Sequence, residues 1–218
     1  MARNFDDASS HGLSVASAPL TAYPFTMACW FNSDDATITQ ILMSICDSAS
    51  ANEEWSLRAA GAVAGDPIRF TSRTGGTNRN ADTTVGYSTG AWTHACAVGV
   101  SATNRSVYIN GGSVGTNVTS STPTSLDTFS IGVSAISVPF GYMSGDIAEA
   151  AIWNVALSAG DVALLALALD HRMVRPQGLV AYWPLIGRYS PEIDRRGGLG
   201  LTVSGAVAAV HPRMFHAG

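Results

Sequence analysis

The sequence predicts an all-β protein built from two antiparallel sheets, with one short helix. Residues 25–31, FTMACWF, alternate between two faces, as in a sandwich strand. Residues 91–100 and 106–110 read as a hairpin. They end in Asn110-Gly111, a dipeptide that favours a tight turn because both residues tolerate positive φ. Helical spacing is found in one place, after Ser158.

The remaining strands are expected in shorter alternating runs. These runs cover residues 38–46, 55–59, 67–72 and 129–133. Between the expected strands at 67–72 and 91–100 lies the stretch 73–90, RTGGTNRNADTTVGYSTG, which is rich in Gly, Thr and Asn. This composition predicts either a long surface loop or a short edge hairpin.

The stretch 140–169 changes its period from strand to helix. Ile147, Glu149, Ala151 and Trp153 alternate, which predicts that they share one face of a strand. Glu149 is expected to accept hydrogen bonds from a loop or an arginine, because a buried carboxylate needs such partners. The helix is expected to begin at Ser158, an N-cap followed by Asp161 at capping-box spacing.

Three motifs of the chain resemble the laminin-G-like, concanavalin A-like jelly-roll family. The first is the strand and helix at 145–158, and the second is the hairpin at 92–111. The third is GLVAYWPL at 178–185, which in that family commonly opens the domain. The resemblance implies a two-sheet antiparallel jelly-roll sandwich that forms a single domain over residues 1–218. Its C-terminal segment 178–218 is then expected to pair back and complete the sandwich, since permutation is tolerated when termini are adjacent.

The same rearranged order is similar to that of structural proteins from tailed bacteriophages. Within this fold we expect four tryptophans to be at least mostly buried: Trp30, Trp92, Trp153 and Trp183. The three cysteines, Cys29, Cys46 and Cys96, are interpreted as small buried thiols. A disulfide between Cys29 and Cys96 is a second possibility if their strands are neighbours.

The composition restricts the classes of partner. Charged residues make up 13% of the chain and the net charge is −4, which argues against a nucleic-acid-binding face. No run of about 18 apolar residues occurs, so membrane insertion is not expected. The N-terminus also lacks the apolar core of a signal peptide. A surface poor in charge is open to association with other proteins.

No catalytic site is predicted, so the chain is expected not to be an enzyme. Glu192 and Asp194 resemble the acidic motif of laminarinase-like glucanases, but a further acidic residue of that motif is missing and arginines follow instead. His94 lies between Trp92 and Cys96 and is interpreted as a satisfied framework histidine. No cofactor is expected, and bound calcium, although a family possibility, is disfavoured because Ala148 replaces an expected ligand. The scattered acids that could contribute are Asp6, Asp7, Asp34, Asp35 and Asp127.

Two functional hypotheses follow. The first is a non-enzymatic structural protein of a bacteriophage virion, a capsid decoration or adhesion module assembled in the host cytoplasm. Its partners would be other virion proteins or further copies of itself as a homo-oligomer. The alternative is a carbohydrate-binding, lectin-like module with a cell-surface glycan as partner. Its candidate ligand-contact aromatics are Tyr23, Tyr87, Tyr142 and Tyr189.

Overall fold

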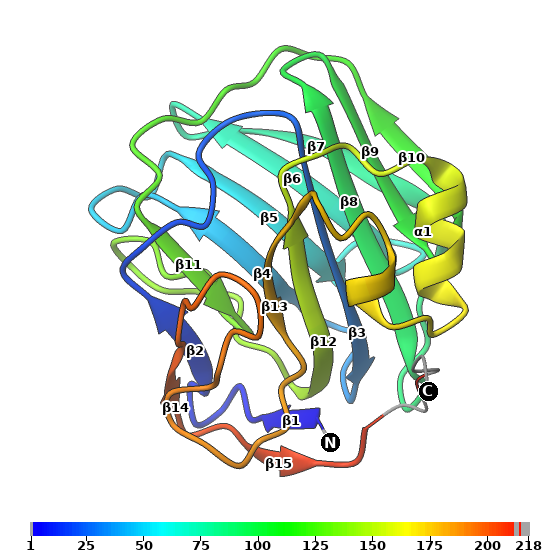
Figure 1. Ribbon diagram of the computed structural model, residues 1–218. Helices are drawn as coiled ribbons and strands as arrows, with labels where there is room; N and C mark the ends of the chain where they lie inside the picture. The colour runs from blue at the N-terminus through cyan, green and yellow to red at the C-terminus, as the bar shows by residue number, and fades with distance from the viewer. Residues whose placement is uncertain (1, 212–213, 215–218) are drawn as a thin grey trace.

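The computed structural model describes residues 2–211 and 214 and shows two antiparallel sheets packed face to face (Figure 1). The first sheet has the order β10-β9-β8-β3-β12-β1-β15, with β13 also paired to β12. Its strands are β1 (Ala2–Phe5), β3 (Phe25–Ser33), β8 (Thr93–Ser101), β9 (Asn104–Ile109), β10 (Gly112–Asn117), β12 (Gly145–Trp153), β13 (Leu179–Trp183) and β15 (Val207–Ala209). The predicted all-β jelly-roll sandwich with one short α-helix is confirmed.

The second sheet has the order β14-β2-β11-β4-β5-β6-β7. Its strands are β2 (Gly12–Val15), β4 (Thr39–Cys46), β5 (Glu54–Ala60), β6 (Pro67–Thr74), β7 (Thr77–Gly86), β11 (Thr128–Ile131) and β14 (Thr202–Ser204). Residues 73–90, for which two predictions were open, mostly form the edge hairpin of β6 and β7 rather than a loop.

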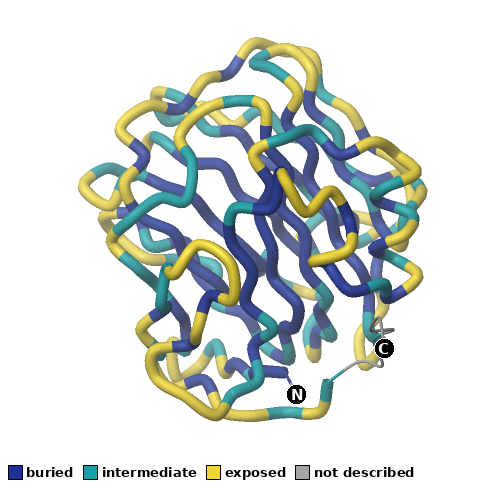
Figure 2. Tube along the Cα trace, viewed as in Figure 1, coloured by how far each residue is buried: buried dark blue, intermediate teal, exposed yellow. Residues whose placement is uncertain are grey.

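The main core lies between the two sheets, where the strands are buried and the connecting loops are exposed (Figure 2). Trp183 and Phe129 stack inside it, with their ring centroids 4.7 Å apart. Trp153 and Trp183 are fully buried, and Trp30 and Trp92 are partly buried. The tryptophans therefore mark the interior, as the alternating pattern predicts.

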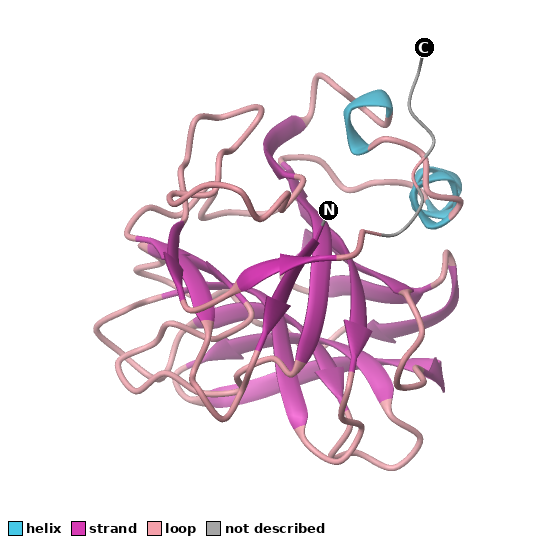
Figure 3. Ribbon diagram, turned by 90° about the horizontal axis from the view of Figure 1, so that it is seen from below, coloured by secondary structure: helices cyan, strands magenta, loops and turns pink. Residues whose placement is uncertain are grey.

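A second, smaller core lies on the outer face of the first sheet. It is covered by α1 (Ala159–Ala166) and the 3-10 helix η1 (His171–Met173), which lie on the same side of the sandwich (Figure 3). The predicted capping box is present, because Asp161 N donates to Ser158 Oγ at 3.2 Å and Ser158 N donates to the Asp161 carboxylate at 3.0 Å. No helix in the described part of the chain is long and apolar enough to cross a membrane.

The three cysteines are buried free thiols, as predicted. The bridge between Cys29 and Cys96 is not formed although β3 and β8 are neighbours. Cys29 pairs with Ala95 and Cys96 pairs with Ala28, so the two thiols lie on opposite faces of the sheet. Cys29 packs in the main core and Cys96 in the outer one.

A β-bulge in β12 overturns part of the predicted alternation. Ala148 pairs with Trp30 and Ala151 with Ala28, so Glu149 and Ala150 together stand opposite Cys29. Glu149 takes a positive φ of 54°, which is uncommon for a residue other than glycine. Ile147 consequently packs in the main core, while Ala151 and Trp153 pack in the outer one.

Three strands after residue 178 lie in the two sheets: β13 pairs with β12, β14 with β2, and β15 with β1. A buried ion pair joins the two ends of the chain, with Arg3 Nε donating to Glu192 at 2.8 Å. Arg3 also donates to the carbonyl oxygens of Ala206 and Tyr189. The loop between β13 and β14 is therefore tied to β1.

Candidate functional site

A gap in the first sheet creates a hollow beside Glu149. On the side of β12 away from β3, β1 pairs with residues 145–147 and β13 with residues 150–153. Neither strand pairs with Ala148 or Glu149. A pocket of about 310 Å³ opens there. Its walls are Glu149, Tyr182, Pro184, Ile186 and His211, together with two arginines, Arg172 and Arg195.

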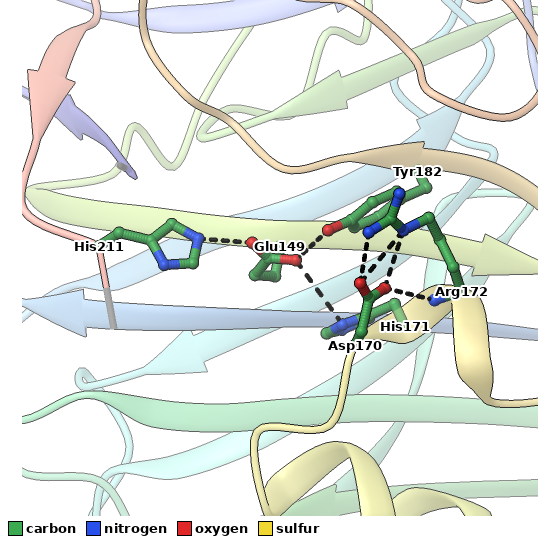
Figure 4. A network of polar contacts seen from close by, with 6 residues as sticks. All are labelled: Glu149, Asp170, His171, Arg172, Tyr182 and His211. Carbon is green, nitrogen blue, oxygen red and sulfur yellow. Dashed lines mark hydrogen bonds and ion pairs between the residues drawn. The ribbon is translucent and has the colours of Figure 1, made fainter. Parts of the chain in front are cut away.

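Glu149 is the centre of a buried polar network (Figure 4). Tyr182 OH donates to one carboxylate oxygen, and His211 Nε2 lies 2.5 Å from the other. His171 Nδ1 stands 3.9 Å from the oxygen that Tyr182 contacts. Glu149 thus has the structural contacts predicted for it, but its partners are a tyrosine and two histidines rather than an arginine.

The network changes the acidity of its members. Burial alone would raise the pKa of Glu149, but the hydrogen bonds from His211 and Tyr182 and the nearby His171 outweigh it, so its pKa is lowered. Burial, and then the Glu149 carboxylate, raise the pKa of Tyr182. Burial lowers the pKa of His171. Near neutral pH the site therefore holds an ionised carboxylate and a protonated phenol.

Two arginines shape the outer part of the pocket. Arg172 makes a forked ion pair with Asp170, with Nη2 2.5 Å from Oδ2, and its guanidinium lies 5.9 Å from the centre of the Tyr182 ring. Arg195 has no side-chain hydrogen bond or ion pair with any residue that the structure describes. A second hollow of about 130 Å³ shares both arginines and adds Arg196.

Behind Tyr182 lies a stack of buried rings. His171 stacks on Tyr182 and on Trp153, with both pairs of ring centroids 5.8 Å apart, and His94 lies beyond it at 6.4 Å. Within the described residues, neither ring nitrogen of His94 or His171 has a hydrogen-bond partner. His94 is fully buried, but its ring is not satisfied as the sequence interpretation assumed.

The four candidate tyrosines lie in separate places. Tyr87 is buried and donates to the Asp35 carbonyl oxygen. Tyr23 is half-buried and contacts Trp55 and Ser121 through its hydroxyl. Tyr142 is half-buried. Tyr189 is 50% exposed. None of them lines the pocket at Glu149, so their role as ligand contacts stays a prediction.

The two acids of the glucanase-like motif contact backbone. The Glu192 carboxylate accepts from Ile186 N at 3.1 Å as well as from Arg3. The Asp194 carboxylate accepts from four backbone N–H groups, those of Tyr182, Arg196, Gly197 and Leu199. These contacts shape the loop that carries Ile186 and Arg195.

The candidate calcium ligands are spread over separate turns. Asp6 accepts from Ser9 Oγ, Asp35 from Thr37 Oγ1, and Asp127 from Ser48. Among the described residues, no group of three or more His, Cys, Asp or Glu side chains is arranged to hold a metal ion.

Most of the pocket residues were not singled out from the sequence. Tyr182 carries the best signal, because it alternates with Ala181 and Trp183 and so points away from the main core with a hydroxyl that needs a partner. Arg172 and Arg195 belong to a stretch of arginines interspersed with acidic residues, a composition typical of a solvated face. His211 lies 62 residues from Glu149, and no local pattern predicts that contact.

The model of the concanavalin A-like lectin/glucanases superfamily matches residues 7–163. The chain belongs to this superfamily. This match confirms the predicted resemblance to the concanavalin A-like family. Residues 164–218, which supply most of the pocket wall, lie beyond the match. A comparison with curated proteins found no match.

Three solved structures illustrate the proteins to which this fold is similar. A candidate carbohydrate-binding protein from Bacteroides ovatus is 19% identical, with a TM-score of 0.66 over 97% of this chain and 60% of that one. A heptameric SAP-like pentraxin from Limulus polyphemus is 15% identical, with a TM-score of 0.66 over 96% and 94% of the two chains. A Ruminococcus gnavus sialidase CBM40, bound to α2,3-sialyllactose, is 13% identical, with a TM-score of 0.58 over 67% and 84%. At these identities the likeness shows the fold alone.

Proposed function

We propose that this chain is a non-enzymatic glycan-binding module and that it takes its ligand in the pocket beside Glu149. The observation that carries the proposal is the pocket itself, an open hollow of about 310 Å³ with both apolar and hydrogen-bonding walls. This volume is near the lower end of the range for ligand sites, about 300–1,000 Å³. Carbohydrate binding by proteins of the same fold supports this proposal.

The pocket offers what a sugar needs for binding. Pro184 and Ile186 supply apolar surface to the pocket. The side chains of Arg172 and Arg195 supply N–H donors. A sugar presents hydroxyl groups on its rim and C–H groups on its faces, so it can use both. Such a mixture of apolar walls and a few polar groups is typical of small-molecule sites.

Binding is favoured over hydrolysis because the described residues of the pocket wall include one carboxylate. Glycosidases of the usual type need two, about 5–9.5 Å apart depending on the mechanism. Glu149 is the carboxylate of the wall, and both of its oxygens already contact Tyr182 or His211. Asp170 is paired with Arg172.

A glycan array tests this function. We expect the wild-type chain to bind a subset of glycans and Ile186→Trp, which fills the pocket, to lose that binding. Ile193→Trp is the matched control, because Ile193 is an exposed isoleucine of the same segment that does not line the pocket. A wild-type chain with no hits contradicts the proposed function. Full binding by Ile186→Trp contradicts the proposed site.

The placement on a bacteriophage virion, as a capsid decoration or adhesion module, stays a prediction. A glycan-binding module is compatible with an adhesion role. Absence of the chain from purified particles would end that hypothesis without touching the glycan-binding proposal.

A further inference from the structure

The wall of the pocket is rich in positive charge. Among the residues that the structure describes, the two adjoining hollows are lined by three arginines, Arg172, Arg195 and Arg196, and by one carboxylate, Glu149. The chain as a whole carries a net charge of −4, so this concentration of arginines departs from the average surface. A cleft lined by one sign of charge attracts ligands of the other sign.

Among the described residues that line the pocket, Arg195 is the cation whose side chain is available to a ligand. Its backbone is fixed, because Arg195 N donates to the Tyr182 carbonyl oxygen at 2.7 Å and the preceding residue, Asp194, anchors the turn. Its side chain is exposed, lines both hollows, and contacts no polar group that the structure describes. A guanidinium held at its base, with all its donors open, suits an anionic ligand group.

Arg172 lies beside it with part of its donor set in use. Nε and Nη2 point to Asp170, while Nη1 makes no hydrogen bond with the described residues. The forked pair with Asp170 fixes the plane of the guanidinium, so its remaining donors are oriented before a ligand arrives. Arg196, in contrast, is engaged with the carbonyl oxygens of Leu179 and Pro176.

Glu149 does not cancel this charge at the surface. Its side chain is 2% exposed, and its oxygens are occupied by Tyr182 and His211. The described residues of the pocket wall also present no open aromatic face, because the Tyr182 ring contacts both His171 and Arg172 and is 3% exposed. A neutral sugar would therefore find little to stack on.

Resting on the glycan-binding function proposed above, we infer that the pocket selects acidic sugars and that Arg195, assisted by Arg172, binds their anionic group. The shared chemistry is a sugar-borne carboxylate or sulfate. Either anion accepts two N–H groups from one guanidinium, and such charge-assisted bonds are about twice as strong as neutral ones. Arg195 is thus the specificity-determining residue.

Calorimetric titration of the full chain with three matched sugars tests this inference. The probes are methyl glucuronide, glucose 6-sulfate and methyl glucoside, which bear a carboxylate, a sulfate and a neutral hydroxymethyl group. We expect at least one acidic probe to bind about tenfold or more tightly than the glucoside, in line with the strength of charge-assisted bonds. Comparison of the two acidic arms shows which anion is preferred.

The variants separate Arg195 from general electrostatics. Arg195→Gln is expected to abolish the preference for the acidic probe, whereas Arg188→Gln, which changes an exposed arginine outside the pocket, is expected to keep it. Equal affinity for all three sugars overturns the inference but leaves glycan binding intact. Inorganic sulfate that binds as tightly as glucose 6-sulfate also overturns it, because the site would then recognise an ion without the sugar. Absence of hits on the glycan array is the separate result that contradicts the proposed function.

Discussion

At the scale of single residues, Glu149 shows how a buried charge is accommodated. Its positive φ directs the carboxylate to the outer face of the sheet, where Tyr182 and His211 approach from the C-terminal part of the chain. The sequence predicted a structural role for this residue, since an acid in an apolar strand needs partners. The identity of the partners was not predictable, because both come from segments remote in sequence.

His94 gives a residue-scale prediction about pH. Burial lowers the pKa of His94 to about 3, whereas an unfolded histidine titrates near 6.5. The unfolded chain therefore binds a proton that the folded chain refuses, and the free energy of unfolding falls as the pH drops from 6.5 towards 3. For one such group, the free energy of unfolding changes with pH by up to about 1.4 kcal/mol per pH unit.

Urea unfolding at several pH values between 7 and 5 checks this prediction. His94→Phe keeps an aromatic ring between Trp30 and His171 but cannot take up a proton. We expect its free energy of unfolding to decline less steeply than that of the wild-type chain over this range. Parallel curves for the two proteins would show that His94 is not the group responsible.

At the scale of elements, local patterns predicted the hairpins and the helix well. Asn110 and Gly111 have φ angles of 49° and 77° and form the turn between β9 and β10, as the dipeptide indicates. The bulge in β12 was missed, because strict alternation through Ile147, Glu149 and Ala151 looks like a regular strand. A bulge adds one residue without changing composition, so a single sequence carries little signal for it.

Strand β10 offers a prediction at this scale. A Cβ atom on Gly115 would lie 1.8 Å from the Asp82 carbonyl oxygen of β7, where the edges of the two sheets meet. Gly115→Ala is therefore expected to lower the free energy of unfolding by about 1–3 kcal/mol or more, as overpacking against fixed backbone does. Chemical denaturation measures this change.

Gly112 of the same strand provides the control. No heavy atom lies within 4 Å of the position where its Cβ would be. Gly112→Ala is expected to change the free energy of unfolding by about 0.5 kcal/mol or less. Similar losses for the two variants would contradict the close approach of β10 and β7.

At the scale of the whole molecule, the fold was more predictable than the site. Three motifs distributed along the chain predicted the sandwich, because each is a local pattern of turn and strand residues. The pocket needs Glu149 from β12, Arg172 from η1, Arg195 from a loop and His211 from beyond β15. The meeting of these four residues depends on the topology of the whole chain, and no single segment of the sequence predicts that topology.

The ion pair between the two ends of the chain gives the whole-molecule prediction. Arg3 and Glu192 have side chains that are 4% and 1% exposed. Arg3→Met is expected to destabilise the chain by about 3–5 kcal/mol, because it leaves a buried carboxylate without its cation. Thermal and urea unfolding provide the measurement.

The double variant Arg3→Met/Glu192→Gln is expected to be more stable than Arg3→Met alone. Its amide oxygen can still accept from Ile186 N, but no uncompensated charge remains. Arg188→Met, at an exposed arginine, is expected to have little effect. A double variant less stable than Arg3→Met would contradict this account of the pair.

The place of β15 beside β1 has a practical consequence for anyone who prepares this protein. Arg3 pairs with Ala208 across nearly the entire length of the polypeptide, and His211 follows directly on that strand. With the glycan-binding function proposed above, retention on an immobilised sugar would therefore select molecules that are intact and correctly closed. Prematurely terminated or partly refolded chains would pass through the column, so a single affinity step would serve as a quality test of the preparation.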